Sequence, residues 1–189
     1  MPVFLSEHLK SIYREKVYRL SLSAGCTCPN RDGKVSFGGC SFCSEGGSGE
    51  FGAGQVNPDL DAQMKEAKER IRQKTDARKF IAYFQSFTNT YGDIDRLRNL
   101  YTRAINKEDV VALSLGTRPD CIDEKVCDMI RDLIKIKPVW IELGLQTVNE
   151  KTAENFNRGY KLETFEKAYK MLKEIGTPGT EMGGQKNFF

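Results

Sequence analysis

Four of the six cysteines lie in one glycine-rich segment between Cys26 and Cys43. Cys40 and Cys43 have the C-x₂-C spacing that lets two thiolates reach one metal centre. Cys26 and Cys28 are one residue closer than the usual zinc hook, so we expect only one ligand from this end. This pattern favours an iron–sulfur cluster on three thiolates, one from the Cys26 and Cys28 end together with Cys40 and Cys43, with one iron left open for a substrate or cofactor.

Two other interpretations of the cysteines are possible. A zinc ion would use four ligands, which here would be all four cysteines of the segment. Cysteines can also be small buried side chains without metal. Cys127 is expected to be one of these, since it shares a predicted helix with Val126 and Met129. Cys121 follows a predicted strand and is a weaker candidate for the site, and His8 is expected at the surface or the edge of the core.

Charge and hydropathy exclude several classes of protein. The net charge is +3, too small to indicate nucleic-acid binding by itself. A small basic group, Arg70 to Lys79, is interpreted as a solvated surface, with an RNA-facing patch as the alternative. No apolar run is long enough for a transmembrane helix, and the N-terminus lacks the apolar region of a secretory signal. We therefore expect a cytoplasmic protein without a membrane partner, whose cysteines do not form a disulfide scaffold.

Elements that position the cysteines can be predicted from hydrophobic periodicity. Four short apolar runs predict strands, and apolar stripes at helical spacing follow them. The strands are expected at 17–22, 80–84, 110–115 and 139–145, and the helical stripes at 60–71, 94–104, 122–133 and 162–175. Alternating strands and helices indicate parallel β/α units.

The predicted first strand leads into a long loop, residues 23–55, which carries the cysteines. A loop of this length in a compact domain is usually functional. It leaves the C-terminal end of the strand, where β/α barrels build their sites. We expect one domain over residues 1–189, an α/β partial barrel of about four β/α units. It would be incomplete at the C-terminus, since residues 177–189 have too few apolar positions for a further unit.

Several motifs in combination resemble the radical S-adenosylmethionine (SAM) superfamily. They are TCPNRDG, GGCSFC, YFQSFTNTY, LSLGTRPDCI and WIELGLQT followed by NRG. The resemblance is to the bacterial branch related to the Elongator catalytic subunit and oxygen-independent coproporphyrinogen oxidase. It implies a partial (β/α)₆ barrel, a [4Fe–4S] cluster held by Cys28, Cys40 and Cys43, and SAM. Such enzymes reductively cleave SAM to a 5′-deoxyadenosyl radical that abstracts hydrogen from a substrate.

The resemblance also implies which residues contact SAM. Ser86 and Thr88 match a motif at the methionine amino group, and Thr117 follows the next strand. Gln146 matches a glutamine near the ribose. The remaining matches are Arg158, at an arginine that pairs with the SAM carboxylate, and Phe42, at an aromatic position by the adenine.

Partners follow from the same resemblance. A reductant such as flavodoxin or ferredoxin would supply the electron, and a tRNA base is a candidate substrate. Relatives continue with two further β/α units, one of which contacts SAM, so catalysis by this form is expected to be impaired. The alternative functions are a non-catalytic zinc- or cluster-binding interaction module, or an inactive truncated form.

Overall fold

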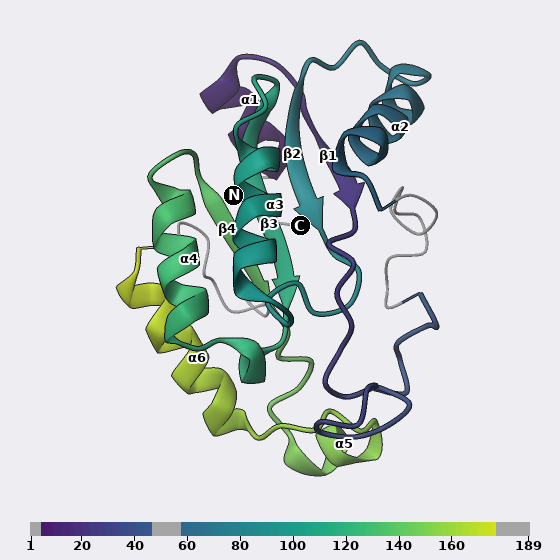
Figure 1. Cartoon of the computed structure of the whole chain (residues 1–189), viewed down its shortest axis with the longest axis vertical. Coiled ribbons are helices and arrows are strands. Elements are labelled where there is room, and N and C mark those ends of the chain that lie inside the picture. The colour runs from purple at the N-terminus through teal and green to yellow at the C-terminus, as the bar shows by residue number, and fades with distance from the viewer. Residues whose placement is uncertain (1–4, 47–57, 177–189) are drawn as a thin grey trace.

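A four-stranded parallel sheet, in the order β1-β2-β3-β4, forms the centre of the molecule (Figure 1). The computed structural model describes residues 5–46 and 58–176. The strands are β1 (Val17–Leu22), β2 (Lys79–Phe84), β3 (Val110–Thr117) and β4 (Val139–Leu143). Consecutive strands are neighbours, as in the β/α barrels that the sequence predicted. The α/β partial-barrel architecture is therefore confirmed.

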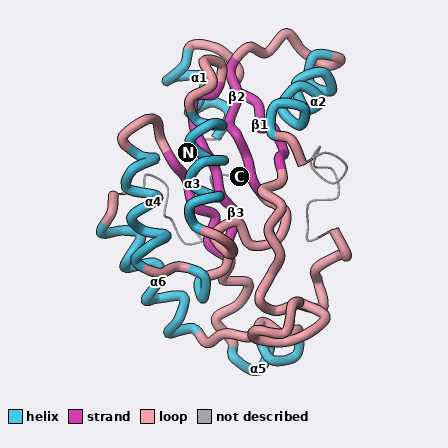
Figure 2. Tube along the Cα trace, in the orientation of Figure 1, coloured by secondary structure: helices cyan, strands magenta, loops and turns pink. Residues whose placement is uncertain are grey.

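Helices on one face of the sheet bury most of the core. The helices on both faces and in the loops are α1 (Leu5–Tyr13), α2 (Leu60–Arg72), α3 (Ile94–Ile105), a 3₁₀ helix η2 (Pro119–Cys121), α4 (Glu124–Ile134), α5 (Glu150–Asn155) and α6 (Leu162–Glu174). Alternate residues of the strands, such as Leu20, Phe84 and Leu113, pack in one apolar cluster with α2, α3 and α4. Figure 2 shows α3 in front of the strands and α2 and α4 on either side of it.

The opposite face of the sheet, which would be the inner face of a barrel, has a different composition. Near its N-terminal end, Leu9 of α1 packs against Ile81 and Ala112, and Tyr13 and Trp140 border this small apolar cluster. Because side chains alternate along a strand, the next inward positions lie closer to the C-terminal edge. Those positions are polar, and they are considered below.

Helix starts follow the predicted capping chemistry. The side chains of Asp59, Asp93 and Asp123 accept hydrogen bonds from backbone N–H groups in the first turns of α2, α3 and α4. Pro58 therefore precedes the cap of α2. Gly176, with φ of +74°, follows Ile175, the C-cap of α6, and ends the helix as predicted.

Several element boundaries differ from the prediction by one to two residues, and two of these differences have a clear cause. The helix predicted from residue 122 is α4, and it begins at Glu124. The 3₁₀ helix η2 ends at Cys121, and Asp123 is the N-cap of α4. Strand β4 ends at Leu143 and not at Leu145, because its pairing partner β3 ends at Thr117, which lies opposite Leu143. The short helix α5 was not predicted.

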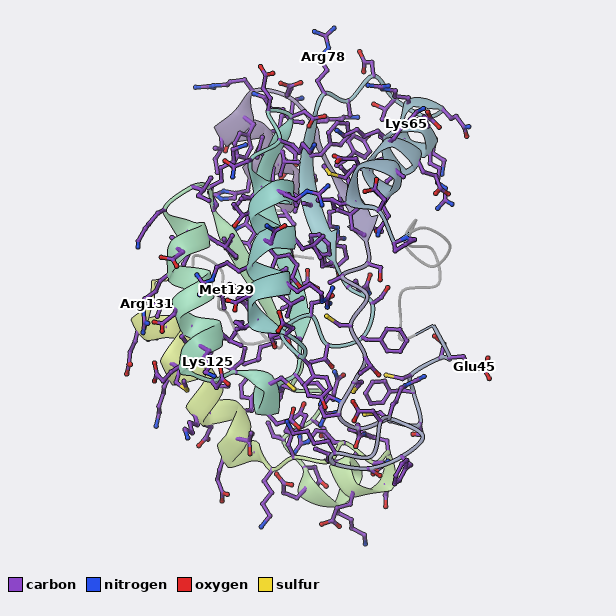
Figure 3. The ribbon with its side chains drawn as sticks, viewed as in Figure 1. Glu45, Lys65, Arg78, Lys125, Met129 and Arg131 are labelled. Carbon is purple, nitrogen blue, oxygen red and sulfur yellow. The ribbon has the colours of Figure 1, made fainter. Side chains whose placement is uncertain are left out.

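The two ends of the sheet have different roles. All four arrowheads in Figure 1 point toward the segment that carries the cysteines, next to α5. The predicted loop is described over residues 23–46; its remainder lies outside the described residues. Arg78 and Lys65 lie at the far end from Glu45 of the cysteine loop (Figure 3). The basic group is thus remote from the candidate site, and two of its members pair with acids, Arg70 with Glu66 and Lys79 with Glu15.

Among the described residues, no helix is long and apolar enough to cross a bilayer. His8 is exposed and Cys127 is buried at 1% exposure, both as expected.

Candidate iron–sulfur and SAM site

Cys28, Cys40 and Cys43 come together in the loop after β1. The backbone turns at both ends of the set: the Cys28 carbonyl accepts from the Arg31 and Asp32 N–H groups, and the Cys43 N–H donates to the Cys40 carbonyl at 2.9 Å. Burial raises the pKa of the Cys40 thiol, and the nearby Cys43 and Cys28 raise it further. The three thiols are therefore within electrostatic range of one another.

Cys26 has a separate environment. Its side chain is 8% exposed, and its Sγ lies 3.8 Å from Nη2 of Arg96, a residue of α3. Burial raises the pKa of this thiol, and Arg96 acts to lower it. The neighbours that perturb Cys26 are thus not the other cysteines of the loop. This arrangement matches three ligands rather than the four of a zinc site.

The three thiols do not form a preformed cage for a single ion. Within residues 5–46 and 58–176, no three His, Cys, Asp or Glu side chains converge on one metal-ion position. The donor set nevertheless fits the open-iron cluster expected from the sequence, which is held by three separated thiolates.

Two donors from outside the ligand set reach the sulfur of Cys40. Asn30 Nδ2 lies 3.4 Å from Cys40 Sγ, and Arg118 Nη1 lies 3.9 Å from it. Arg118 is fixed by a bidentate pair with Asp120, at 2.9 and 2.7 Å. Burial acts to lower the pKa of Arg118, but Asp120 outweighs it and the pKa is raised, so the guanidinium stays charged. Both groups stabilise negative charge on sulfur, as outer-sphere donors do at metal–thiolate sites.

The NRG segment after α5 docks on the cysteine loop, more than a hundred residues away in sequence. Asn157 Nδ2 donates to the Gly39 carbonyl at 3.0 Å, and its own carbonyl accepts from Asn30 Nδ2 at 2.6 Å. The Ser41 N–H donates to the Phe156 carbonyl at 3.0 Å. These three hydrogen bonds join the loop after β1 to the segment after β4 around the cysteines.

Three of the predicted SAM contacts lie at the ends of β2 and β3 and are buried. Ser86, Thr88 and Thr117 have 4%, 1% and 7% exposure. Thr117 Oγ1 is 2.6 Å from the Thr90 hydroxyl. Thr88 Oγ1 is buried without a hydrogen-bond partner, and such an orphan atom calls for an explanation. A ligand that brings a donor, such as the SAM amino group, would satisfy it.

Two other predicted contacts are exposed. Phe42, 50% exposed, packs edge-on against Phe156 with ring centroids 5.2 Å apart. Gln146 is exposed on a left-handed turn after β4. Phe87, between Ser86 and Thr88, is also left-handed (φ +61°). Strained non-glycine residues concentrate at functional sites, and here two follow the C-terminal ends of strands.

Arg158 differs from the prediction. Its side chain is 1% exposed, and its guanidinium donates to three backbone carbonyls and to a carboxylate. The acceptors are the carbonyls of Tyr160, Leu145 and Thr147 and the Oε1 atom of Glu150, at 2.9, 3.2, 2.6 and 3.1 Å. A guanidinium with these partners holds the turn after β4 together and has little capacity left for a SAM carboxylate. The structure therefore assigns Arg158 a positioning role.

A pocket of about 580 Å³ lies beside the cysteine loop. Cys26, Cys121, Lys34 and Arg96 are among its lining residues, and none of the six predicted SAM contacts is. Burial raises the pKa of Cys121 to about 12, and Asp120 raises it too.

Sequence reasoning missed the residues that support the cysteines: Asn30, Arg118, Asn157 and Gly159. Their motifs, CPNRDG, GTRPD and NRG, were recognised, but the side chains lie in different loops. A Cβ on Gly159 would come within 2.7 Å of Asn30 Oδ1, so this close approach requires glycine. The presence of Asn and Gly in short loop motifs was the available signal.

Comparisons with known proteins agree with this geometry. The chain is 41% identical over 172 residues to YtqA of Bacillus subtilis, which covers 91% of this chain and 53% of the relative. It is 33% identical over 165 residues to YhcC of Escherichia coli K12, with 87% and 52% coverage. The chain thus spans about half the length of these curated relatives. A Methanocaldococcus jannaschii protein named tRNA uridine(34) acetyltransferase is 34% identical over 89 residues, 42% of this chain and 16% of its own.

A solved structure and a family profile complete the comparison. The Elp3 protein of Methanocaldococcus infernus superposes with a TM-score of 0.58 at 18% identity, over 86% of this chain and 36% of that chain. This likeness shows a shared fold. The profile of the Radical SAM superfamily matches residues 26–186, which include the four cysteines of the loop and the strands β2, β3 and β4. The chain therefore belongs to the radical SAM superfamily.

Proposed function

We propose that this chain binds a [4Fe–4S] cluster through Cys28, Cys40 and Cys43 and binds SAM at the C-terminal edge of the sheet. The observation that carries the proposal is the environment of these thiols in the loop after β1, where Asn30 and Arg118 approach the Cys40 sulfur while Cys26 contacts Arg96 instead. When bound, the cluster and SAM supply the reductive cleavage that yields a 5′-deoxyadenosyl radical, which abstracts hydrogen from the substrate.

The residues of the chain hold and orient these groups. Asn30 and Arg118 direct donors at the Cys40 sulfur and so stabilise thiolate charge. Ser86, Thr88, Thr117, Gln146 and Phe42 are the proposed SAM contacts. Arg158 acts indirectly, since it fixes the turn that carries Gln146.

Anaerobic reconstitution with iron and sulfide tests the metal assignment. We expect about four irons per chain, as a cubane requires, and a broad visible absorption. Cys28→Ala, Cys40→Ala and Cys43→Ala should each lose the cluster, whereas Cys26→Ala, the matched control in the same loop, should retain it. Stoichiometric zinc without iron uptake would overturn the assignment and favour an interaction module.

The reaction class is tested on the reconstituted chain. After reduction with dithionite, SAM should be converted to 5′-deoxyadenosine, detected by chromatography. Flavodoxin or ferredoxin is the proposed physiological reductant, in the cytoplasm, where thiols stay reduced. A longer relative such as YtqA, assayed in parallel, shows whether residues beyond this chain's span raise the rate. A loaded cluster without SAM cleavage in either protein would refute the proposed reaction.

We further propose a tRNA nucleoside as the substrate. The support is the shared segment with the protein named tRNA uridine(34) acetyltransferase. The basic group at the opposite end of the sheet lends no support, because it lies far from the cysteines (Figure 3). Mass spectrometry of tRNA nucleosides from a strain lacking the gene tests the proposal, and an unchanged nucleoside profile would remove it.

A further inference from the structure

One polar residue from each strand meets on the inner face of the sheet, between the apolar cluster under α1 and the C-terminal edge. We call these residues, Arg19, Tyr83, Ser114 and Glu142, the inner-face polar belt. They alternate along the strands with the core residues Leu20, Phe84, Leu115 and Ile141, which face the helices. Each belt residue lies within three positions of its strand's last residue, which is about 10 Å or less along the strand from the C-terminal edge of the sheet.

Glu142 is the centre of the belt. Its Oε2 accepts from the Tyr83 hydroxyl at 2.8 Å, and its Oε1 accepts from the Ser114 hydroxyl at 3.4 Å. Burial raises the pKa of Tyr83, and Glu142 raises it further, so the phenol remains protonated and keeps donating. The carboxylate is therefore fixed by hydroxyl groups from two other strands, β2 and β3. A carboxylate offers about four acceptor sites, so it can accept a further hydrogen bond.

Arg19 lies beside this carboxylate but does not form a hydrogen bond with it. Its Nη1 is 3.9 Å from Glu142 Oε1, which is beyond hydrogen-bond distance, and its guanidinium lies 5.0 Å over the Tyr83 ring. The side chains of Arg19 and Glu142 are 43% and 26% exposed. The ring and the ion pair orient the guanidinium, while most of its five donors remain available. A charged donor and a charged acceptor thus lie side by side at an open surface.

This pair has a specific chemical complement. A group that presents a carbonyl and an N–H on the same side accepts from Arg19 and donates to Glu142 at once. Cyclic amides have this geometry, because the ring holds the amide cis. A trans peptide bond directs its N–H and C=O to opposite sides and cannot satisfy both residues. An anion would be attracted by the Arg19 guanidinium but repelled by the Glu142 carboxylate.

We propose that the inner-face polar belt is the substrate-recognition floor of the site and binds a cyclic amide edge through Arg19 and Glu142. As a statement about substrate, the inference rests on the proposed function, but the binding step requires neither the cluster nor SAM. The belt also accounts for polar side chains on a face that is apolar nearer α1.

NMR titration of the full chain under reducing conditions, with arginine Nε–H and tyrosine ring signals as reporters, tests the proposal. The probes are 2-pyrrolidinone, a cis amide, and N-methylacetamide, a trans amide of similar size. We expect saturable shifts at Arg19 and Tyr83 with 2-pyrrolidinone, and weaker shifts, without saturation, with N-methylacetamide. Equal responses to the two amides, or none to either, would overturn the proposal. Stronger binding of acetate or phosphate would also overturn it and indicate an oxyanion site.

Variants localise the binding. Arg19→Gln and Glu142→Gln should each weaken 2-pyrrolidinone binding by about tenfold, the equivalent of one charge-assisted hydrogen bond. Arg98→Gln is the matched control, because Arg98 pairs with Asp132 between α3 and α4, away from the belt. If a belt variant fails to fold, the two-amide comparison on the natural chain still decides. Lactam binding without SAM cleavage would refute the proposed function alone, whereas SAM cleavage without lactam binding would refute this inference alone.

Discussion

The contact between the NRG segment and the cysteine loop can be tested at two glycines with the same backbone conformation. Gly159 has φ of +79° and Gly38 has φ of +80°. A Cβ at Gly159 would lie 2.7 Å from Asn30 Oδ1 and 2.9 Å from Val35 Cγ1. A Cβ at Gly38 would have nothing within 4 Å. Alanine at either position therefore has the same backbone penalty, and only Gly159→Ala adds a steric clash.

The magnitudes follow from this difference. A left-handed alanine costs about 1–2 kcal/mol at either site. The clash at Gly159 adds about 1–3 kcal/mol, the usual range for overpacking. Asn30 cannot move aside cheaply, because it is fully buried and its Nδ2 donates to the Asn157 carbonyl at 2.6 Å. The free energy of unfolding should therefore fall by about 1–3 kcal/mol more in Gly159→Ala than in Gly38→Ala.

Urea unfolding followed by circular dichroism measures this difference on the metal-free chain. A second readout is iron uptake in anaerobic reconstitution. It should be lower in Gly159→Ala, because displacement of Asn30 removes a donor to the Cys40 sulfur. Equal destabilisation of the two variants would refute the reasoning, since it would mean that NRG does not pack on the loop as described. Full iron uptake by Gly159→Ala would show that cluster binding does not depend on the packing of Gly159 against Asn30.

Two further substitutions test buried polar groups. Arg158→Gln should lower the free energy of unfolding by at least about 2 kcal/mol, because it removes several buried hydrogen bonds. Arg131→Gln, at a surface ion pair on α4, should change it by less than about 0.5 kcal/mol; similar effects would contradict the structural role of Arg158. Burial raises the pKa of Cys121 to about 12, so the folded chain keeps a proton that the unfolded chain loses above the ordinary thiol pKa of 9.0. Stability should therefore fall between these pH values, and Cys121→Ala should make that fall shallower in urea titrations at alkaline pH; parallel pH profiles would contradict it.

Local patterns predicted much of the fold. Apolar runs and helical stripes identified the four strands and the helices α2, α3, α4 and α6, because the core face of each element has a strong period. Capping by Asp93 could also be predicted, because it depends only on residues that are close in the sequence. The 3₁₀ turn before α4 and the short helix α5 have no such periodic signal. Their conformation depends on loops such as the one fixed by Arg158.

The cysteine spacing by itself indicated a site with three thiolates, and the motifs in combination identified the family and pointed to Cys28 as the third. The tertiary structure decided what surrounds them, because the partners of Cys40 come from loops distant in sequence. It placed Asn30 and Arg118 at the Cys40 sulfur and turned Arg158 from a predicted SAM contact into a buried cross-link. It also placed Arg19 next to Glu142, from the first and last strands of the sheet. Spacing along a chain reports local chemistry, whereas contacts between strand ends depend on the curvature and register of the sheet.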